Sequence, residues 1–217
     1  LTRTKQLDDA VLSVVRESFK TSSAIRFEGN GYSDEWVTEA EGRGLKNLRR
    51  TPEALDELVS APAKALFSST RILSEAELES RYHVRVERYV KDMLIEVDTL
   101  AQIADTLVLP AGLAYASALA RGAAHAKQAG ISKAPQAAAA EKVGALVEAL
   151  VEARERLGRV ADTANGMHGD PADCARLLTG EGAEAIAAVR AASDALELAL
   201  PDDQWPLPKY REMLFPV

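Results

Sequence analysis

Apolar residues recur at spacings of three and four along most of this chain, which is the period of one face of an α-helix. The first such segment covers residues 5–21, where charged side chains occupy the opposite side. This pattern predicts an amphipathic helix whose apolar face needs a neighbour. The residues of that face are Leu7, Val11, Val14, Val15 and Phe19.

The next segment reads as short elements separated by turns. Residues 24–27, Ala-Ile-Arg-Phe, predict a short extended segment. The glycine-rich run Gly29-Asn30-Gly31 predicts a turn, since left-handed backbone angles cost least at glycine. The extended segment would have no ladder partner within this sequence.

Two short helices follow. Ser33 is a good N-cap with acidic residues after it, and Gly42 or Gly44 can close the helix, so we expect a helix over residues 34–42. Thr51 before Pro52 repeats the start signal and predicts a helix over residues 52–60.

Ser74 and Glu77 form a capping-box pattern that opens the longest periodic segment. We expect this helix to run for about 34 residues, or roughly 50 Å, before Pro110 forces a kink or a break. Beyond Pro110 it can resume as far as Gly130. The apolar stripe comprises Leu78, Tyr82, Val86, Tyr89, Met93, Val97, Leu100, Ile103 and Leu107, then Leu113, Ala116 and Leu119.

Two further helical stretches complete the chain. Pro135 begins the first, and residues 165–169 read as the loop that follows it. Asp170 before Pro171 begins the second, which Gly180 and Gly182 can interrupt and Pro201 stops. Their stripes are Val143, Leu146, Val147, Leu150, Leu157 and Val160, then Ile186, Val189, Leu196, Leu198 and Leu200.

These elements predict a mainly all-α fold, an antiparallel bundle of long amphipathic helices with a short N-terminal extended segment and small helices. We expect three regions. Residues 1–73 form an N-terminal segment with short helices, residues 74–200 form the long-helix bundle, and residues 201–217 form a tail that packs back on the fold.

Composition narrows the function. The net charge of -7 argues against nucleic acid as the main partner, because phosphate neutralisation needs clustered cations. No run of 18 apolar residues occurs, so the sequence predicts no membrane span. The N-terminus lacks the basic-then-apolar order of a secretory signal, so export is not predicted either. Cys174 is the only cysteine, which fits a reducing cytoplasm.

Residues that could carry chemistry are scattered. His83, His125 and His168 lie far apart, and Glu79 shares a helix face with His83 at a spacing that is usually a surface contact. Cys174 has no base near it in sequence. We therefore assign no catalytic, cofactor-binding or metal-ligating residue and expect no cofactor in this chain.

Four other features have both a structural and a functional interpretation. The turn at Gly29–Gly31 could place amides around an anion, but the lysine and hydroxyl of a phosphate-binding loop are absent. Trp36 is more plausible as a packing anchor than as a substrate platform. Glu96 falls on or beside the apolar stripe, where a buried carboxylate needs a partner. Its structural interpretation is a salt bridge to an arginine of another helix, and its functional interpretation is a role in transmitting a signal or the state of a bound ligand. A basic cluster, Arg43, Lys46, Arg49 and Arg50, is either solvated or faces an acidic surface of a neighbouring chain.

Three motifs carry a family resemblance. They are Gly29-Asn30-Gly31-Tyr32-Ser33-Asp34-Glu35-Trp36 with its continuation to Asn47, the segment Arg88-Tyr89-Val90-Lys91 with Ile95-Glu96, and Trp205-Pro206-Leu207-Pro208-Lys209-Tyr210 with Met213-Leu214-Phe215. Together they resemble the C-terminal helical region of the type III glutamine synthetases.

The resemblance implies a parent enzyme, a glutamate-ammonia ligase that uses ATP and Mg or Mn in a homo-oligomer. The reacting groups of that family lie upstream of a segment like this one. The resemblance therefore implies a C-terminal fragment that is inactive alone, is structural, and has the rest of the subunit and neighbouring subunits as partners.

Two alternatives remain open. One is a free-standing helical module for protein interaction. The other is an effector-binding or enzymatic bundle, for which polar side chains should converge between helices at the kink near Pro110.

Overall fold

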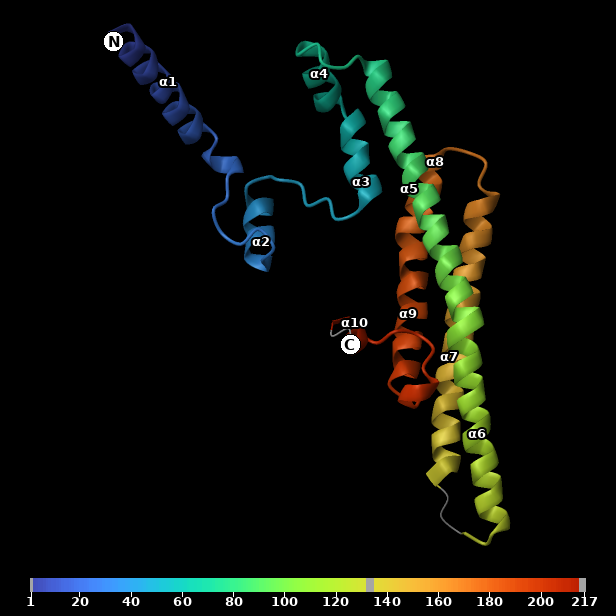
Figure 1. Ribbon diagram of the computed structural model, residues 1–217. Helices are drawn as coiled ribbons and strands as arrows, with labels where there is room; N and C mark the ends of the chain where they lie inside the picture. Colours follow the sequence, from blue (N-terminus) through green and yellow to red (C-terminus); the bar gives the residue numbers. More distant parts are fainter. Residues whose placement is uncertain (1, 132–134, 215–217) are drawn as a thin grey trace. The chain divides into compact units, whose positions relative to one another are not determined.

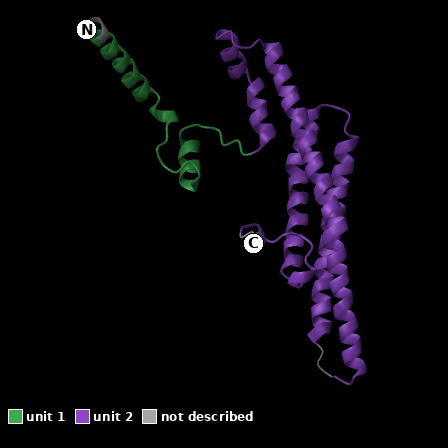
Figure 2. Cartoon of the chain, in the orientation of Figure 1, with its two compact units in different colours: residues 1–49 green, residues 50–217 purple. Residues whose placement is uncertain are grey.

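The computed structural model describes residues 2–131 and 135–214, and they belong to two compact units. The first unit covers Leu1–Arg49 and the second covers Arg50–Val217 (Figure 2). Residues 50–73, which we grouped with the N-terminus, thus fall in the same unit as the long helices.

The first unit contains α1 (Thr2–Thr21), a 3-10 turn (Ser23–Ile25) and α2 (Asp34–Gly42). Both predicted helices are confirmed. The predicted extended segment is wrong over Ala24 and Ile25, because backbone hydrogen bonds from Ile25 N to Ser22 O at 3.2 Å and from Arg26 N to Ser23 O at 3.3 Å close a 3-10 turn. Local hydrogen bonds satisfy amides that would otherwise need a second strand.

Left-handed glycine occurs at Gly44, which we expected could close the helix, but not in the turn at Gly29–Gly31. Within the described residues the glycines with positive φ are Gly44 and Gly130, both at 76°, and not Gly29 or Gly31. At the end of α2, Gly44 N donates to Glu41 O at 2.9 Å and Leu45 N donates to Ala40 O at 2.9 Å, which is a Schellman cap. Gly29 has a steric role instead, since a Cβ there would lie 2.5 Å from the Phe27 ring.

The second unit begins with α3 (Thr51–Asp56), a 3-10 turn (Glu57–Val59) and α4 (Ala61–Ser69). Thr51 is the first helical residue and not the N-cap as we predicted, because the cap position is Arg50. We did not predict α4, although Ser60 caps it by accepting a hydrogen bond from Ala63 N at 3.4 Å. Buried Leu55 packs with Val86 and Ala172, which holds these short helices on the long ones.

One long helical rod follows. It consists of α5 (Glu75–Ile103), a π-turn (Ala104–Val108) and α6 (Leu109–Gln128). The capping box is confirmed, with Glu77 N donating to Ser74 Oγ at 3.3 Å and Ser74 N donating to Glu77 Oε2 at 2.8 Å. Pro110 lies in the first turn of α6, directly after the π-turn. Proline is tolerated at this position because its missing amide is not needed in the first turn of a helix.

The π-turn also shifts the apolar stripe. Leu107, which we placed on the stripe, is 39% exposed, whereas Val108 is 1% exposed. A π-turn inserts a residue into the helical period, so the buried position moves by one. The stripe on α6 is likewise displaced, because Leu113 is exposed and Gly112 is buried.

The remaining helices are α7 (Pro135–Gly166), α8 (Pro171–Leu177) and α9 (Ala183–Glu197), with a second π-turn (Leu178–Gly182) between α8 and α9. The predicted interruption at Gly180 and Gly182 is this π-turn. The predicted loop begins later than expected, since Asn165 and Gly166 still belong to α7. Leu198 is 90% exposed and not on the stripe as predicted, because α9 ends at Glu197.

Figure 1 shows α6 and α7 running side by side in opposite directions, with α9 on the other side of α7. Their shared core contains Val97, Val108, Val143, Val147, Leu150, Leu157, Val160, Val189 and Leu196. After a 3-10 turn (Asp202–Gln204), Trp205 joins this core, and the described residues end with the short helix α10 (Tyr210–Leu214).

One helical stretch within Glu75–Gln128 is long and apolar enough to cross a membrane by length and composition. The core helix of a soluble protein passes the same test, so this stretch does not show a membrane span.

Candidate functional site

The first motif lies at the start of α2, where its amides are already bonded to side chains. Asn30 Oδ1 accepts from Tyr32 N at 3.1 Å, and Ser33 Oγ accepts from Trp36 N at 3.3 Å. Hydrogen bonding with its own backbone amide and with Ser33 lowers the pKa of Glu35. The motif therefore builds a capped turn, and nothing in these contacts favours an anion site.

Trp36 serves as a packing residue within the first unit. Its ring stacks on Phe27 with centroids 4.2 Å apart, and the Arg43 guanidinium lies 5.6 Å from its centroid. Arg43 Nη1 also donates to Arg26 O at 2.6 Å. These contacts join α2 to the residues before it, which supports the packing interpretation of Trp36.

The four residues of the basic cluster differ in their contacts. Arg43 is engaged within its own unit and forms an ion pair with Glu39. Arg50 belongs to the second unit, where its Nη1 donates to Thr179 O at 3.2 Å. Lys46 and Arg49 are exposed.

His83 and Cys174 have structural surroundings, whereas His125 and His168 are exposed. Glu79 is paired with Lys64 at 2.8 Å, and this hydrogen bond is the main cause of its lowered pKa. His83 packs edge-on against Tyr82. Burial raises the pKa of Cys174, which makes it a poor nucleophile. Within residues 2–131 and 135–214, no three His, Cys, Asp or Glu residues gather as a metal ion would require.

Glu96 is exposed, so the prediction that it lies on or beside the apolar stripe as a buried carboxylate is wrong. The buried stripe passes through Val97 instead. Glu96 lines a shallow groove of about 380 Å³ between α5 and α9, together with Ile95, Ile186 and Arg190.

A polar cluster surrounds the π-turn at Leu178–Gly182. The Tyr89 and Thr179 hydroxyls are hydrogen-bonded to each other, and Tyr82 Oη donates to Asp56 Oδ1 at 2.8 Å. Burial, followed by the hydrogen bond to Asp56, raises the pKa of Tyr82 to about 12. Because its members pair with one another across α3, α5 and the π-turn, the cluster is best explained as a structural joint.

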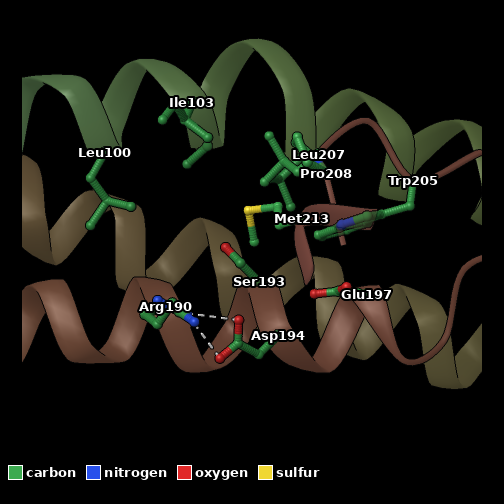
Figure 3. Close-up of a pocket in the computed structure, with 12 residues that line it drawn as sticks. Leu100, Ile103, Arg190, Ser193, Asp194, Glu197, Trp205, Leu207, Pro208 and Met213 are labelled. Carbon is green, nitrogen blue, oxygen red and sulfur yellow. Dashed lines mark hydrogen bonds and ion pairs between the residues drawn. The ribbon is translucent and has the colours of Figure 1, made fainter. Parts of the chain in front are cut away.

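The other π-turn, Ala104–Val108, forms one wall of a pocket of about 300 Å³. The opposite wall is α9, and the chain after Trp205 closes the side (Figure 3). Most of the lining is apolar. The lining residues are Leu100, Ile103, Ala104, Val108, Trp205, Leu207, Pro208 and Met213, with Arg190, Ser193, Asp194 and Glu197 from α9.

The polar groups of this pocket differ in their partners. Arg190 Nε donates to both carboxylate oxygens of Asp194, at 2.9 and 3.0 Å. Ser193 Oγ donates to Val189 O at 2.9 Å. Between the described residues, no hydrogen bond or ion pair engages the Glu197 carboxylate, which Figure 3 shows beside the Trp205 ring.

Sequence reasoning named none of these four polar residues. The available signals were their helical spacing on α9 and the position of Pro110, beside which we expected convergent polar groups if the bundle binds a small molecule. The pocket lies beside the π-turn that precedes Pro110 and combines apolar walls with four polar side chains, so it is the best candidate for a binding site.

Comparison with known proteins gives the family. The sequence pattern of the glutamine synthetase C-terminal domain matches residues 10–127. A glutamine synthetase from Bacteroides fragilis strain YCH46 is 30% identical over 221 residues, covering 96% of this chain and 29% of the relative. A type-3 glutamine synthetase from Dictyostelium discoideum is 32% identical over 208 residues, covering 93% of this chain and 28% of the relative.

A third relative, a glutamine synthetase from Butyrivibrio fibrisolvens, is 36% identical over 98 residues, which are 45% of this chain and 14% of that protein. This chain thus spans less than a third of the length of each of these relatives. The family pattern covers more than half of the chain and contains the motif from Gly29 to Asn47. The chain therefore belongs to the glutamine synthetase C-terminal domain family.

Proposed function

We propose that this chain is the C-terminal helical part of an enzyme that makes glutamine from glutamate and ammonia with ATP, and that it supports the active centre without forming it. The observation that carries the proposal is that nearly the whole chain matches glutamine synthetases, while the chain spans less than a third of their length. The reacting groups then belong to the rest of the subunit.

The described residues do not fit the metal ions and ATP of such an enzyme. They offer no gathered set of metal ligands, and the amides at the start of α2 are bonded to side chains. We therefore assign no step of ligation to this chain. The parent would hold ATP and Mg or Mn elsewhere. A single buried free cysteine is compatible with the cytoplasm, where we place the enzyme.

The surface that supports this role is the apolar face of α1. Its large apolar side chains are between 45% and 66% exposed, namely Leu7, Val11, Leu12, Val14, Val15 and Phe19. Fully burying one such side chain contributes about 1.5 to 3 kcal/mol, so a partner surface over this face gains several kcal/mol. We propose that the rest of the subunit, or a neighbouring subunit in a homo-oligomer, covers it.

An assay of γ-glutamyl transfer with Mg or Mn tests the first part. We expect no activity from residues 1–217 alone, and metal-dependent transfer by this purified chain would contradict the proposal.

Substitution in the complete enzyme tests the second part. Val11→Asp with Val15→Asp should dissociate the oligomer or detach this region, because two carboxylates would have to be buried in the contact. The control is Val84→Asp on α5, where the side chain is also exposed, at 63%. An intact, fully active assembly in the α1 variant would exclude α1 as the contact.

A further inference from the structure

The pocket at the π-turn Ala104–Val108 has the composition of a small-molecule site. Its volume of about 300 Å³ lies at the lower end of the range for such sites, and its walls are mainly apolar with a few polar groups. Two π-turns occur in the described bundle, and π-turns frequently accompany functional sites. The polar groups of the other π-turn are paired with one another, whereas those of this pocket are not all paired.

The charges around the pocket do not cancel. Arg190 and Asp194 are bonded to each other, so their charges offset. Glu197 adds a second carboxylate that no described residue neutralises, and it is only partly exposed. The Lys209 ammonium, on the segment that closes the pocket, is bonded to Asp202 and donates to Asp202 O at 2.9 Å. The described side chains that line the pocket therefore carry an excess of one negative charge.

The walls define the rest of the ligand. Trp205 is 9% exposed and packs into the bundle core, and Leu100, Ile103 and Met213 complete an apolar lining. A cation near an aromatic face and a carboxylate is stabilised by both. An apolar tail on the same ligand is stabilised by burial against the apolar walls. An anionic ligand would have to approach Glu197 without compensation.

We propose that this pocket binds a small organic cation, a primary ammonium on a short aliphatic chain, with the ammonium on Glu197 and the chain between Trp205 and Leu100. The wall formed by α5 and the π-turn lies within the family match over residues 10–127, whereas Glu197 and Trp205 lie beyond it. Binding there would use no feature of the ligase reaction. Binding would link α9 and the C-terminal segment to the long helix, so the ligand acts as an effector of this region.

The test uses the complete 217-residue chain and three probes of equal length: n-pentylammonium, 1-pentanol and pentanoate. Isothermal titration calorimetry should show saturable one-to-one binding of the ammonium. The alcohol should bind at least about tenfold more weakly, since its neutral hydroxyl can donate to Glu197 but supplies no positive charge, and pentanoate should not bind. Equal binding of ammonium and alcohol, or no saturable ammonium binding in the millimolar range, would overturn the proposal.

Variants locate the site. Glu197→Gln should weaken ammonium binding at least about tenfold and leave pentanol unchanged. The matched control, Glu148→Gln, changes an exposed carboxylate on α7 and should have no effect. Met213→Lys places a competing ammonium on a 57% exposed side chain at the pocket, so it tolerates substitution and should abolish binding. Unchanged ammonium affinity in either pocket variant would show that the cation binds elsewhere.

Discussion

The two units of this chain use the same apolar period in opposite ways. In the second unit the stripe on α7 is buried, with Leu157 at 0% exposure, because α5, α6 and α9 cover it. In the first unit the stripe on α1 is exposed, with Phe19 at 57%. A helical apolar period thus indicates that a face seeks a partner, but not whether the partner is in the same chain.

The largest expected effect contrasts one leucine from each unit. Leu157→Ala removes a fully buried side chain and should lower the free energy of unfolding by about 2.7 to 5 kcal/mol, because a cavity is left in the core. Leu12→Ala changes a residue that is 45% exposed and should cost less than about 1 kcal/mol. Urea denaturation of the isolated chain measures both, and equal costs would mean that α1 is covered in solution.

A smaller effect tests how closely α6 and α7 pack within the second unit. A Cβ at Gly112 would lie 2.9 Å from Val147 Cγ2, so Gly112→Ala should destabilise the chain by about 1 kcal/mol, the cost of overpacking exceeding the helix-propensity gain.

At Gly144 on α7, a Cβ would meet nothing within 4 Å. Gly144→Ala should therefore stabilise the chain by up to about 1 kcal/mol. The two alanines should shift the thermal midpoint in opposite directions, and shifts of the same sign would refute the close α6–α7 approach.

The smallest effect concerns pH and the joint between α3 and α5. The pKa of Tyr82 is raised to about 12, so the stabilisation from its protonated hydroxyl is complete below pH 10 and is lost as pH rises toward 12. Tyr82→Phe should remove this part of the alkaline loss and cost about 1 kcal/mol near pH 7.

Tyr32 in the first unit is the matched control, because it is fully exposed and Tyr32→Phe should change neither quantity. Urea titrations at several pH values between 8 and 12 separate the two variants. Identical pH profiles for wild type and Tyr82→Phe would show that the bond to Asp56 does not form.

The helices of this chain were largely predictable because their signals are local. The capping box at Ser74, the Ser33 cap and the Schellman glycine Gly44 each use residues within one turn of the chain. The missed helix α4 had a start signal of the same kind at Ser60 and Pro62. Its apolar residues are few and partly exposed, so they form no apolar stripe that would have predicted a helix.

The pocket was not predictable in the same way. Glu96 drew attention by its place near the stripe and proved exposed, whereas Glu197 resembled any other surface carboxylate in the sequence. Its setting depends on Trp205, a residue beyond the end of α9, and on the π-turn Ala104–Val108, about ninety positions before Glu197. A pattern of neighbouring residues does not indicate that these three distant segments come together.

Local hydrogen bonding and apolar spacing were sufficient to specify an all-α chain, most helix ends and the family motifs, because these depend on neighbours within a few residues. The register after the π-turn, the burial of Val108 in place of Leu107, and the pocket beside Glu197 depended on packing between distant segments. Such packing is a sum of many weak long-range contacts, and a one-dimensional pattern records which residues can take part but not which of them meet.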